Sequence, residues 1–285
     1  MAWWEALILG LVQGLTEFLP VSSSGHLVLG QYFLGINEPG ITFEVFVHFG
    51  TVMSILTVYR RRVFQLLADL IRALATPSYI VEALRPGTIE HDYTGDASEK
   101  NLRVSVRLAA FILLSMIPTG LVYVFFGDWL ASKFTDPRFV CAMLLVTGVI
   151  LLMIRFRPDP NGVLSPVKAM AVGLAQGAAM IPGISRSGST IMAAIYLNVD
   201  RKQAADFSFL MSIPVILGAT LLDVIDIVGS GASPNWVPLF IGALVAYVSG
   251  VWAIRVVLDF VKRGKLQYFG YYLFVVGTLG LIFIR

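Results

Sequence analysis

The sequence has 285 residues, of which 57% are hydrophobic and only 14% are charged, with a formal net charge of +3. Soluble globular domains are roughly 45–50% apolar and about 25% charged, so this balance excludes an ordinary soluble domain. It predicts an all-α polytopic membrane protein, built as a single integral domain over residues 1–285 and surrounded by membrane lipid. Nothing in the sequence points to a nucleic-acid partner, and the single Cys141 excludes a disulfide framework.

The first apolar region, residues 3–35, is broken near its middle by proline, glycine and serine. Crossing a bilayer takes about 20 mostly apolar residues, and neither half of this region is long enough. Broken helices at membrane depth are tolerated only where the backbone is buried in protein or lines a wet cavity. We therefore expect a re-entrant helix hairpin here, and a second one at residues 167–198, which are broken in the same way.

The other long apolar stretches predict spanning helices. Residues 60–103 form the one sizeable loop between them, in which residues 63–75 have the pattern of a short amphipathic helix at the membrane surface. The fold class is therefore six spanning helices plus two re-entrant hairpins. The six predicted spans are residues 41–59, 104–126, 138–155, 203–225, 237–257 and 268–284.

Positive charge divides the connecting loops into two sets. Arginine and lysine collect in loops at 60–103, 155–168, 201–202 and 262–265, and the predicted spans place all four on one side. Loops rich in arginine and lysine face the cytoplasm in most membrane proteins, so this side is expected to be cytoplasmic.

The two broken regions match each other without gaps when the chain is shifted by 163 positions, which places GLVQG at 10–14 over GLAQG at 173–177. Three predicted spans follow each hairpin, and three is odd, so the second copy enters from the opposite face. This pattern predicts an inverted-topology repeat of residues 1–155 and 165–285, unless two Gly/Ser-rich apolar segments resemble each other by chance. The coinciding polar positions are Ser22 with Ser185, Ser24 with Ser187 and Gly25 with Gly188.

The first break contains ionisable side chains that an apolar segment would otherwise avoid. Gln13 and Glu17 are four residues apart and share a helical face, Pro20 should end or kink that helix, and His26 should open the next one after the break SSSG. A helix start after serines offers N–H groups and a positive dipole end to an anion. An ionisable residue inside a membrane protein is a functional-site hypothesis by default.

The second break, PGISRSGST at 182–190, places Arg186 at its tip, and the guanidinium fork matches phosphate oxygens. If the two tips meet, the site suits phosphate binding and phosphoryl transfer, but it would equally hold a transported phosphate or carboxylate. Structural interpretations remain open as well. Glu17 and Arg186 could form a buried structural ion pair, His26 could be a helix-cap histidine, and the serines, Ser22 and Ser24 more than Ser23, could be caps.

Glu44 and His48 also share a helical face, just inside the span at 41–59. They could line the same cavity or lie at the membrane interface, and the sequence does not choose between these positions. Asp206, after the second hairpin, is expected to cap or pair locally.

The two motifs QGLTEFLPVSSSGH and PGISRSGST resemble those of the bacterial undecaprenyl pyrophosphate phosphatases, the BacA/UppP family. The first matches the family pattern E/Q-x-x-x-E and the second matches P-G-x-S-R-S-x-x-T. The resemblance implies an enzyme of the bacterial cytoplasmic membrane that hydrolyses undecaprenyl pyrophosphate to undecaprenyl phosphate and inorganic phosphate. This step recycles the lipid carrier for cell-wall synthesis, and excess activity is associated with bacitracin resistance.

The resemblance also implies functional residues and a divalent cation, Mg²⁺ or Ca²⁺. Glu17, Ser23, His26 and Arg186 are the expected catalytic residues, and Glu17 and Gln13 the expected metal ligands. Gln13 takes the place of the first glutamate of the family motif, which puts in doubt any mechanism that requires two carboxylates in this helix. The attacking group is left open between Ser23, a water molecule and His26. The residues expected to bind the substrate are Ser22, Ser24, Gly25, Ser185, Ser187, Gly188 and Thr190.

The predicted topology brings the first hairpin in from the outer face, so we expect an active site that opens outward. An inverted repeat is also a transporter's architecture, which makes a flippase for the phosphorylated carrier, or another anion transporter, the rival hypothesis. A non-catalytic scaffold would leave Glu17 and Arg186 unexplained. The type-2 phosphatidic acid phosphatases share SGH and SR fragments but need a further histidine and aspartate cluster, which His48 and His91 do not provide. Small residues in the spans permit a homodimer without naming its face.

Overall fold

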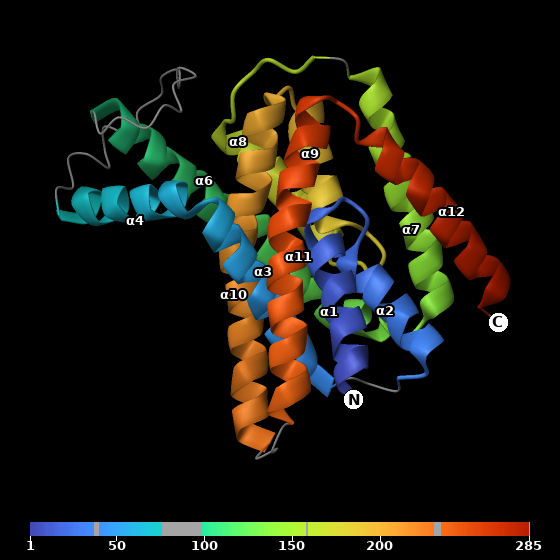
Figure 1. The fold of residues 1–285 in the computed structure, drawn as a ribbon. Helices are drawn as coiled ribbons and strands as arrows, with labels where there is room; N and C mark the ends of the chain where they lie inside the picture. The colour runs from blue at the N-terminus through green and yellow to red at the C-terminus, as the bar shows by residue number, and fades with distance from the viewer. Residues whose placement is uncertain (37–39, 76–98, 158, 231–234, 285) are drawn as a thin grey trace.

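The computed structural model describes residues 1–36, 40–75, 99–157, 159–230 and 235–284, and every regular element in them is a helix (Figure 1). The all-α prediction is therefore confirmed for the described chain. The first half contains α1 (Trp3–Phe18), α2 (Ser23–Leu34), α3 (Gly40–Val58), α4 (Arg60–Ala75), α6 (Glu99–Lys133), α7 (Pro137–Leu152) and a 3₁₀ turn η1 (Met153–Phe156). The second half contains α8 (Pro166–Ala178), α9 (Arg186–Tyr196), α10 (Arg201–Ser230), α11 (Trp236–Lys262) and α12 (Gln267–Phe283).

The chain is a multi-pass membrane protein. In its described part four helices are long and apolar enough to cross a bilayer, within α6, α7 with η1, α10 and α11. Helix α3 passes the same test together with α4, from which it is bent by 83°, and α12 is an apolar helix of 17 residues. Large apolar side chains on these helices face outward, such as Phe125 at 74% and Val248 at 60% exposure, as expected for surfaces in contact with lipid.

Two pairs of short helices are arranged as re-entrant hairpins. Helices α1 and α2 have 16 and 12 residues, and α8 and α9 have 13 and 11. At 1.5 Å per residue each is about 17–24 Å long, which is less than the roughly 30 Å hydrocarbon core. In Figure 1 the first pair starts and ends at the lower edge of the bundle, and the second pair starts and ends at the upper edge. The two hairpins thus enter from opposite faces.

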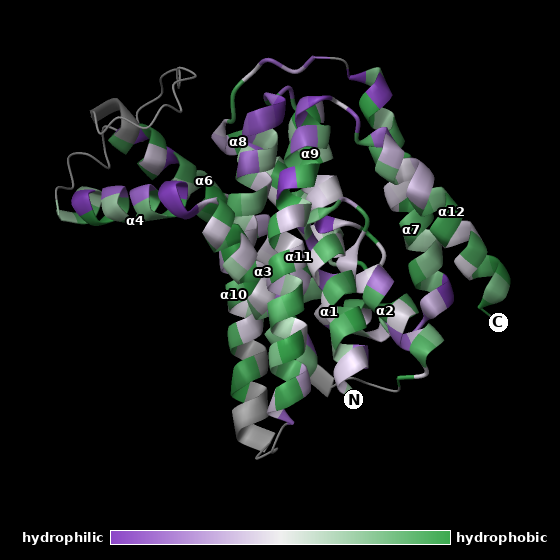
Figure 2. Ribbon diagram, in the orientation of Figure 1, coloured by the Kyte–Doolittle hydropathy of each residue, from purple (hydrophilic) through white to green (hydrophobic). Residues whose placement is uncertain are grey.

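Polar residues gather at the edge where the second hairpin enters. Figure 2 shows hydrophilic residues at the upper ends of the helices and hydrophobic residues along their lengths. Helix α4 runs sideways from the upper half of the bundle, and Phe64, Ile71 and Leu74 on it are each more than two-thirds exposed. An amphipathic helix with an exposed apolar face and several arginines suits the membrane surface, as the sequence predicts for this segment.

The hairpins interlock the two halves of the chain. Helix α1 of the first half packs on α11 of the second, and α8 of the second half packs on α6 of the first. Glycines permit this close approach: a Cβ added at Gly10 would lie 2.5 Å from the carbonyl oxygen of Gly242, and one at Gly173 would overlap Ser115. Small residues that let helix backbones approach closely are the usual device for helix packing in membranes.

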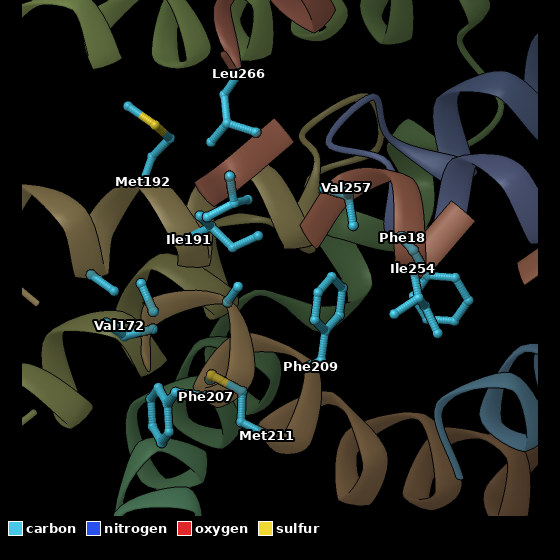
Figure 3. Packing of buried hydrophobic residues seen from close by; sticks show 14 of the residues in the cluster. Phe18, Val172, Ile191, Met192, Phe207, Phe209, Met211, Ile254, Val257 and Leu266 are labelled. Carbon is cyan, nitrogen blue, oxygen red and sulfur yellow. The ribbon is translucent and has the colours of Figure 1, made fainter. Parts of the chain in front are cut away.

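A buried apolar cluster supports the middle of the bundle (Figure 3). Phe18, which follows Glu17 at the end of α1, packs edge-on against Phe209 of α10 with ring centroids 6.0 Å apart. Ile254 and Val257 of α11 belong to the same cluster. These contacts fix the end of α1, and therefore the position of the Glu17 backbone.

Several predicted boundaries were wrong. Helix α6 begins at Glu99 and ends at Lys133, beyond both ends of the predicted span 104–126, and α4 begins at Arg60. Ser23 and Arg186 are the first residues of α2 and α9 and not part of irregular breaks, and His26 lies one turn inside α2. The starts of α2 and α9 differ from the prediction because Ser22 and Ser185 cap these two helices, so the residues after each cap are already helical.

Candidate active site

The two hairpin breaks meet inside the bundle. The Ser187 hydroxyl donates to the Leu19 carbonyl oxygen at 3.3 Å. A Cβ added at Gly188 would lie 3.2 Å from the Cβ of Pro20, and one at Gly25 would lie 3.3 Å from the Cα of Gly183. The meeting of the tips, which the repeat predicted, therefore depends on glycine at both contact points.

Each second helix of a hairpin begins with a serine cap. The Ser22 hydroxyl oxygen accepts from the Gly25 N–H at 3.2 Å, and that of Ser185 accepts from the Gly188 N–H at 3.1 Å. Ser22 has a left-handed backbone with φ of 71°, whereas Ser185 has an ordinary φ of −75°. The two helix N-termini, with their N–H groups and positive dipole ends, consequently lie side by side at the meeting point.

Glu17 is the centre of the polar network there and is 7% exposed. One carboxylate oxygen accepts from the Ser23 hydroxyl at 2.6 Å and from the Gln13 amide at 3.0 Å. The other accepts from the Arg186 guanidinium of the second hairpin, with which Glu17 forms an ion pair. The carboxylate is thus oriented by three donors from both halves of the chain, and Ser23 is placed to give it a proton.

A cavity of about 420 Å³ adjoins this network. Glu17, Ser23 and Arg186 lie on its wall, together with Ser22, Ser24 and Ser185. The remaining wall is mainly apolar and comes from the C-terminal end of α6, from the residue that follows it and from the middle of α10. These residues include Leu130, Ala131, Phe134, Val215, Ile216 and Ala219. The cavity therefore combines an anion-binding end with walls suited to a hydrocarbon chain.

His48 lines the same cavity, whereas the Glu44 side chain is exposed. The ring nitrogen Nδ1 of His48 lies 2.8 Å from the Glu44 carbonyl oxygen. A carbonyl oxygen only accepts, so Nδ1 carries the hydrogen and Nε2 is the other functional nitrogen. Of the two positions that the sequence left open, the structure gives His48 the cavity and Glu44 the surface.

His26 is placed differently from the expectation of a residue beside Glu17. Its Nδ1 lies 2.8 Å from the Ser22 carbonyl oxygen and its Nε2 lies 2.9 Å from the hydroxyl of Tyr272. The two rings stack with centroids 5.6 Å apart, and in the described chain His26 is not among the residues that line the cavity. A catalytic role for His26 stays a prediction, and the contacts show it supporting the Ser22 backbone.

The predicted substrate-binding residues divide into two groups. Ser22, Ser24 and Ser185 line the cavity. Thr190 does not line it, and its hydroxyl donates to the Arg186 carbonyl oxygen at 2.8 Å and is 2.6 Å from the Ser208 hydroxyl. The other three, Gly25, Ser187 and Gly188, make the contacts between the breaks described above and contribute no cavity wall in the described chain.

Oxygen ligands for a hard divalent cation are present beside Glu17. The Oε1 atom of Gln13 is buried, and it has no hydrogen-bond partner within the described residues. Amide and carboxylate oxygens suit Mg²⁺ and Ca²⁺. Over the described chain no three histidine, cysteine or acidic side chains are grouped as a metal site.

Fold and site together define an inverted-repeat integral membrane protein whose guanidinium, carboxylate and serine site suits an anionic group on an apolar chain. The chain belongs to the family of bacitracin resistance protein BacA, whose model matches residues 6–279. An undecaprenyl-diphosphatase of Salinibacter ruber is 52% identical over 283 residues, which is 99% of each chain. Those of Halothermothrix orenii and Bacteroides fragilis are 39% and 36% identical and cover 98% and 99% of this chain, and 97% and 98% of their own.

Proposed function

We propose that the protein hydrolyses undecaprenyl pyrophosphate to undecaprenyl phosphate and inorganic phosphate at the junction of the two hairpins. The observation that carries this proposal is the contact of Arg186 with Glu17 beside Ser23, in a cavity whose other walls are apolar. The relatives bear the name of this activity, and the residue types at the site are those that phosphoryl transfer requires.

The reacting phosphate is bound by Arg186 and by N–H groups in the first turns of α2 and α9. The guanidinium fork pairs with phosphate oxygens and stabilises the charge that spreads over them in the transition state. Glu17 accepts the proton of the Ser23 hydroxyl, with which it already shares a 2.6 Å hydrogen bond. The attacking oxygen is that of Ser23 or of a water molecule held at the same carboxylate, and the leaving group is the prenyl monophosphate. If Ser23 attacks, water then hydrolyses the phosphoserine ester, which releases inorganic phosphate and restores the hydroxyl.

We further propose that Mg²⁺ or Ca²⁺ takes part, and that Gln13 and Glu17 are the residues that would hold it. Such a cation neutralises phosphate charge when it is bound. The unpartnered Oε1 of Gln13, 0% exposed beside the carboxylate, supports this assignment. Within the protein, Arg186 and the helix N-termini orient the phosphate and Glu17 holds the proton.

The membrane is proposed to be the bacterial cytoplasmic membrane. The edge with the loops rich in arginine and lysine would face inside, and the cavity would open towards the outer face. The cavity wall includes the C-terminal end of α6, which precedes α7 on the side of the bundle away from the polar edge of Figure 2, and this supports the orientation. Cysteines placed at Lys133 and at Lys265 test it, because the single native Cys141 is buried. A membrane-impermeant maleimide added to whole cells should label only the first; labelling of the second alone would reverse the orientation. The homodimer stays a prediction.

Phosphate release decides between the phosphatase and the rival flippase. Purified protein in detergent, supplied with a long-chain prenyl pyrophosphate and Mg²⁺ or Ca²⁺, should release inorganic phosphate, and Arg186→Ala should not. A flippase moves lipid between two compartments and releases no phosphate. Folded wild-type protein that releases none would therefore exclude the phosphatase, and the same residues would then be a transport site.

A further inference from the structure

The charge of the cavity does not match the substrate proposed for it. Of the ionisable residues on its wall in the described chain, Glu17 and Arg186 neutralise each other as an ion pair, and Tyr123 is ordinarily neutral. A prenyl pyrophosphate has two phosphate groups and more than one negative charge. Arg186, the hairpin N–H groups and the cation proposed at Glu17 and Gln13 account for the phosphate that reacts at Ser23. The second phosphate still requires a donor from the protein.

His48 is the remaining ionisable residue on that wall. Its Nδ1 is fixed by the Glu44 carbonyl oxygen at 2.8 Å, and α3 is held in place by its packing against α10 and α11. The Nε2 atom therefore stays available on a ring of fixed orientation. When the ring is protonated, Nε2–H donates to a phosphate oxygen as a charge-assisted hydrogen bond.

Thr220 on α10 provides a second and independent observation. It lines the same cavity, and its hydroxyl oxygen is buried with no hydrogen-bond partner within the described residues. Buried hydroxyl groups are nearly always hydrogen-bonded in native structures, so a missing partner on a cavity wall indicates a ligand group. Val215, Ile216 and Ala219 precede it on α10 and line the same wall. The unpartnered hydroxyl is thus next to surface suited to a hydrocarbon chain.

We infer that His48 and Thr220 form a second phosphate subsite, which binds the phosphate that carries the prenyl chain. This inference rests on the proposed function, because it places the terminal phosphate at Ser23 and Arg186. The linking phosphate then lies between the reacting phosphate and the apolar α10 wall, which receives the chain. His48 Nε2–H and the Thr220 hydroxyl donate to its oxygens, and the same contacts hold the prenyl monophosphate product.

Equilibrium binding of a prenyl monophosphate and of inorganic phosphate to purified protein in detergent tests the subsite. His48→Ala should weaken prenyl monophosphate binding by about tenfold or more, the equivalent of one charge-assisted hydrogen bond. Binding of inorganic phosphate should change by less than about twofold, because Arg186 remains. His48→Gln should fall between wild type and His48→Ala, since its amide keeps one N–H donor. Glu44→Gln is the matched control, because Glu44 contributes only its backbone carbonyl to the ring.

Thr220→Val keeps the shape of the side chain and removes the hydroxyl, so it tests the same subsite if His48→Ala does not fold. It should weaken prenyl monophosphate binding by about threefold to tenfold. Unchanged monophosphate binding in both variants would overturn the inference, as would equal losses for the two ligands. Binding needs no turnover, so the comparison remains decisive even if the wild type releases no phosphate. The absence of release would count against the proposed function alone.

Discussion

Arg186, the first residue of α9, donates to the carboxylate of Glu17, the second-to-last residue of α1, across 169 positions of sequence. The 163-residue offset of the repeat places Arg186 over Ser23, and it places Met180 over Glu17. The two hairpins therefore share a layout of helix, break and helix but differ at the two positions that form the ion pair. The ion pair is therefore asymmetric, with a carboxylate from one half of the repeat and a guanidinium from the other.

The glycine contacts between helices give a first prediction. Gly10→Ala would place a methyl group 2.5 Å from the Gly242 carbonyl oxygen, so α1 must move away from α11. Overpacking of this kind costs about 1–3 kcal/mol, and we expect a lower unfolding temperature in detergent. Gly120→Ala is the control, because a Cβ there meets nothing within 4 Å. Equal unfolding temperatures for the two variants would show that this close approach is unimportant.

The serine caps give a second prediction, about backbone strain. Either Ser22→Ala or Ser185→Ala removes a cap and should cost about 1 kcal/mol of stability. Glycine tolerates the left-handed backbone of residue 22, with φ of 71°, better than alanine does. In thermal unfolding, Ser22→Gly should therefore be more stable than Ser22→Ala. The corresponding difference between Ser185→Gly and Ser185→Ala should be smaller. The same difference at both positions would contradict the strained conformation of Ser22.

Ser23 should be required for turnover in a way that other buried serines are not. Ser23→Ala removes the hydroxyl that donates to Glu17, and we expect phosphate release to fall by at least about 100-fold. Ser54→Ala is the matched control, since the Ser54 hydroxyl is buried but donates only to the carbonyl oxygens of Gly50 and Tyr247. Turnover of Ser23→Ala within a few-fold of the control would leave water as the attacking group, without help from Ser23.

The role of Gln13 in metal binding can be measured by titrating Mg²⁺ or Ca²⁺ during phosphate release. Gln13→Ala removes the buried oxygen, so half-maximal activity should require more metal. Gln13→Glu provides a second carboxylate, so it should require less, because hard cations bind carboxylates more strongly than amides. If all three proteins need the same metal concentration, Gln13 is not a ligand.

Much of the architecture could be predicted because it depends on local signals. Apolar length, loop charge and the repeated break each act within a short window, and the repeat adds the expectation that the tips meet. The first residues of α2 and α9 could not be predicted, because each break contains several serines and any of them could cap the helix. The backbone conformation of the folded chain makes Ser22 and Ser185 the capping residues.

Two histidines show why side-chain roles at the site were harder to predict. His26 lies one turn inside α2, where its ring reaches Tyr272 of α12, a contact across 246 positions that no local pattern signals. His48 faces the cavity because of how α3 is rotated against α10 and α11. Apolar residues are spread over every side of α3, so its sequence gives little indication of that rotation. The spacing of Glu44 and His48 identified a shared face but not its direction.

Phosphate release by three purified proteins tests the central claim, that both hairpins contribute to one catalytic site. Wild type, Glu17→Gln and Arg186→Lys would be compared in detergent on a long-chain prenyl pyrophosphate, with Mg²⁺ or Ca²⁺ and then with chelator. We predict metal-dependent release by wild type and losses of about 100-fold or more in both variants, because lysine keeps the charge but not the bidentate fork. Near-normal turnover of Arg186→Lys with inactive Glu17→Gln would contradict the shared site and leave the chemistry to the first hairpin alone.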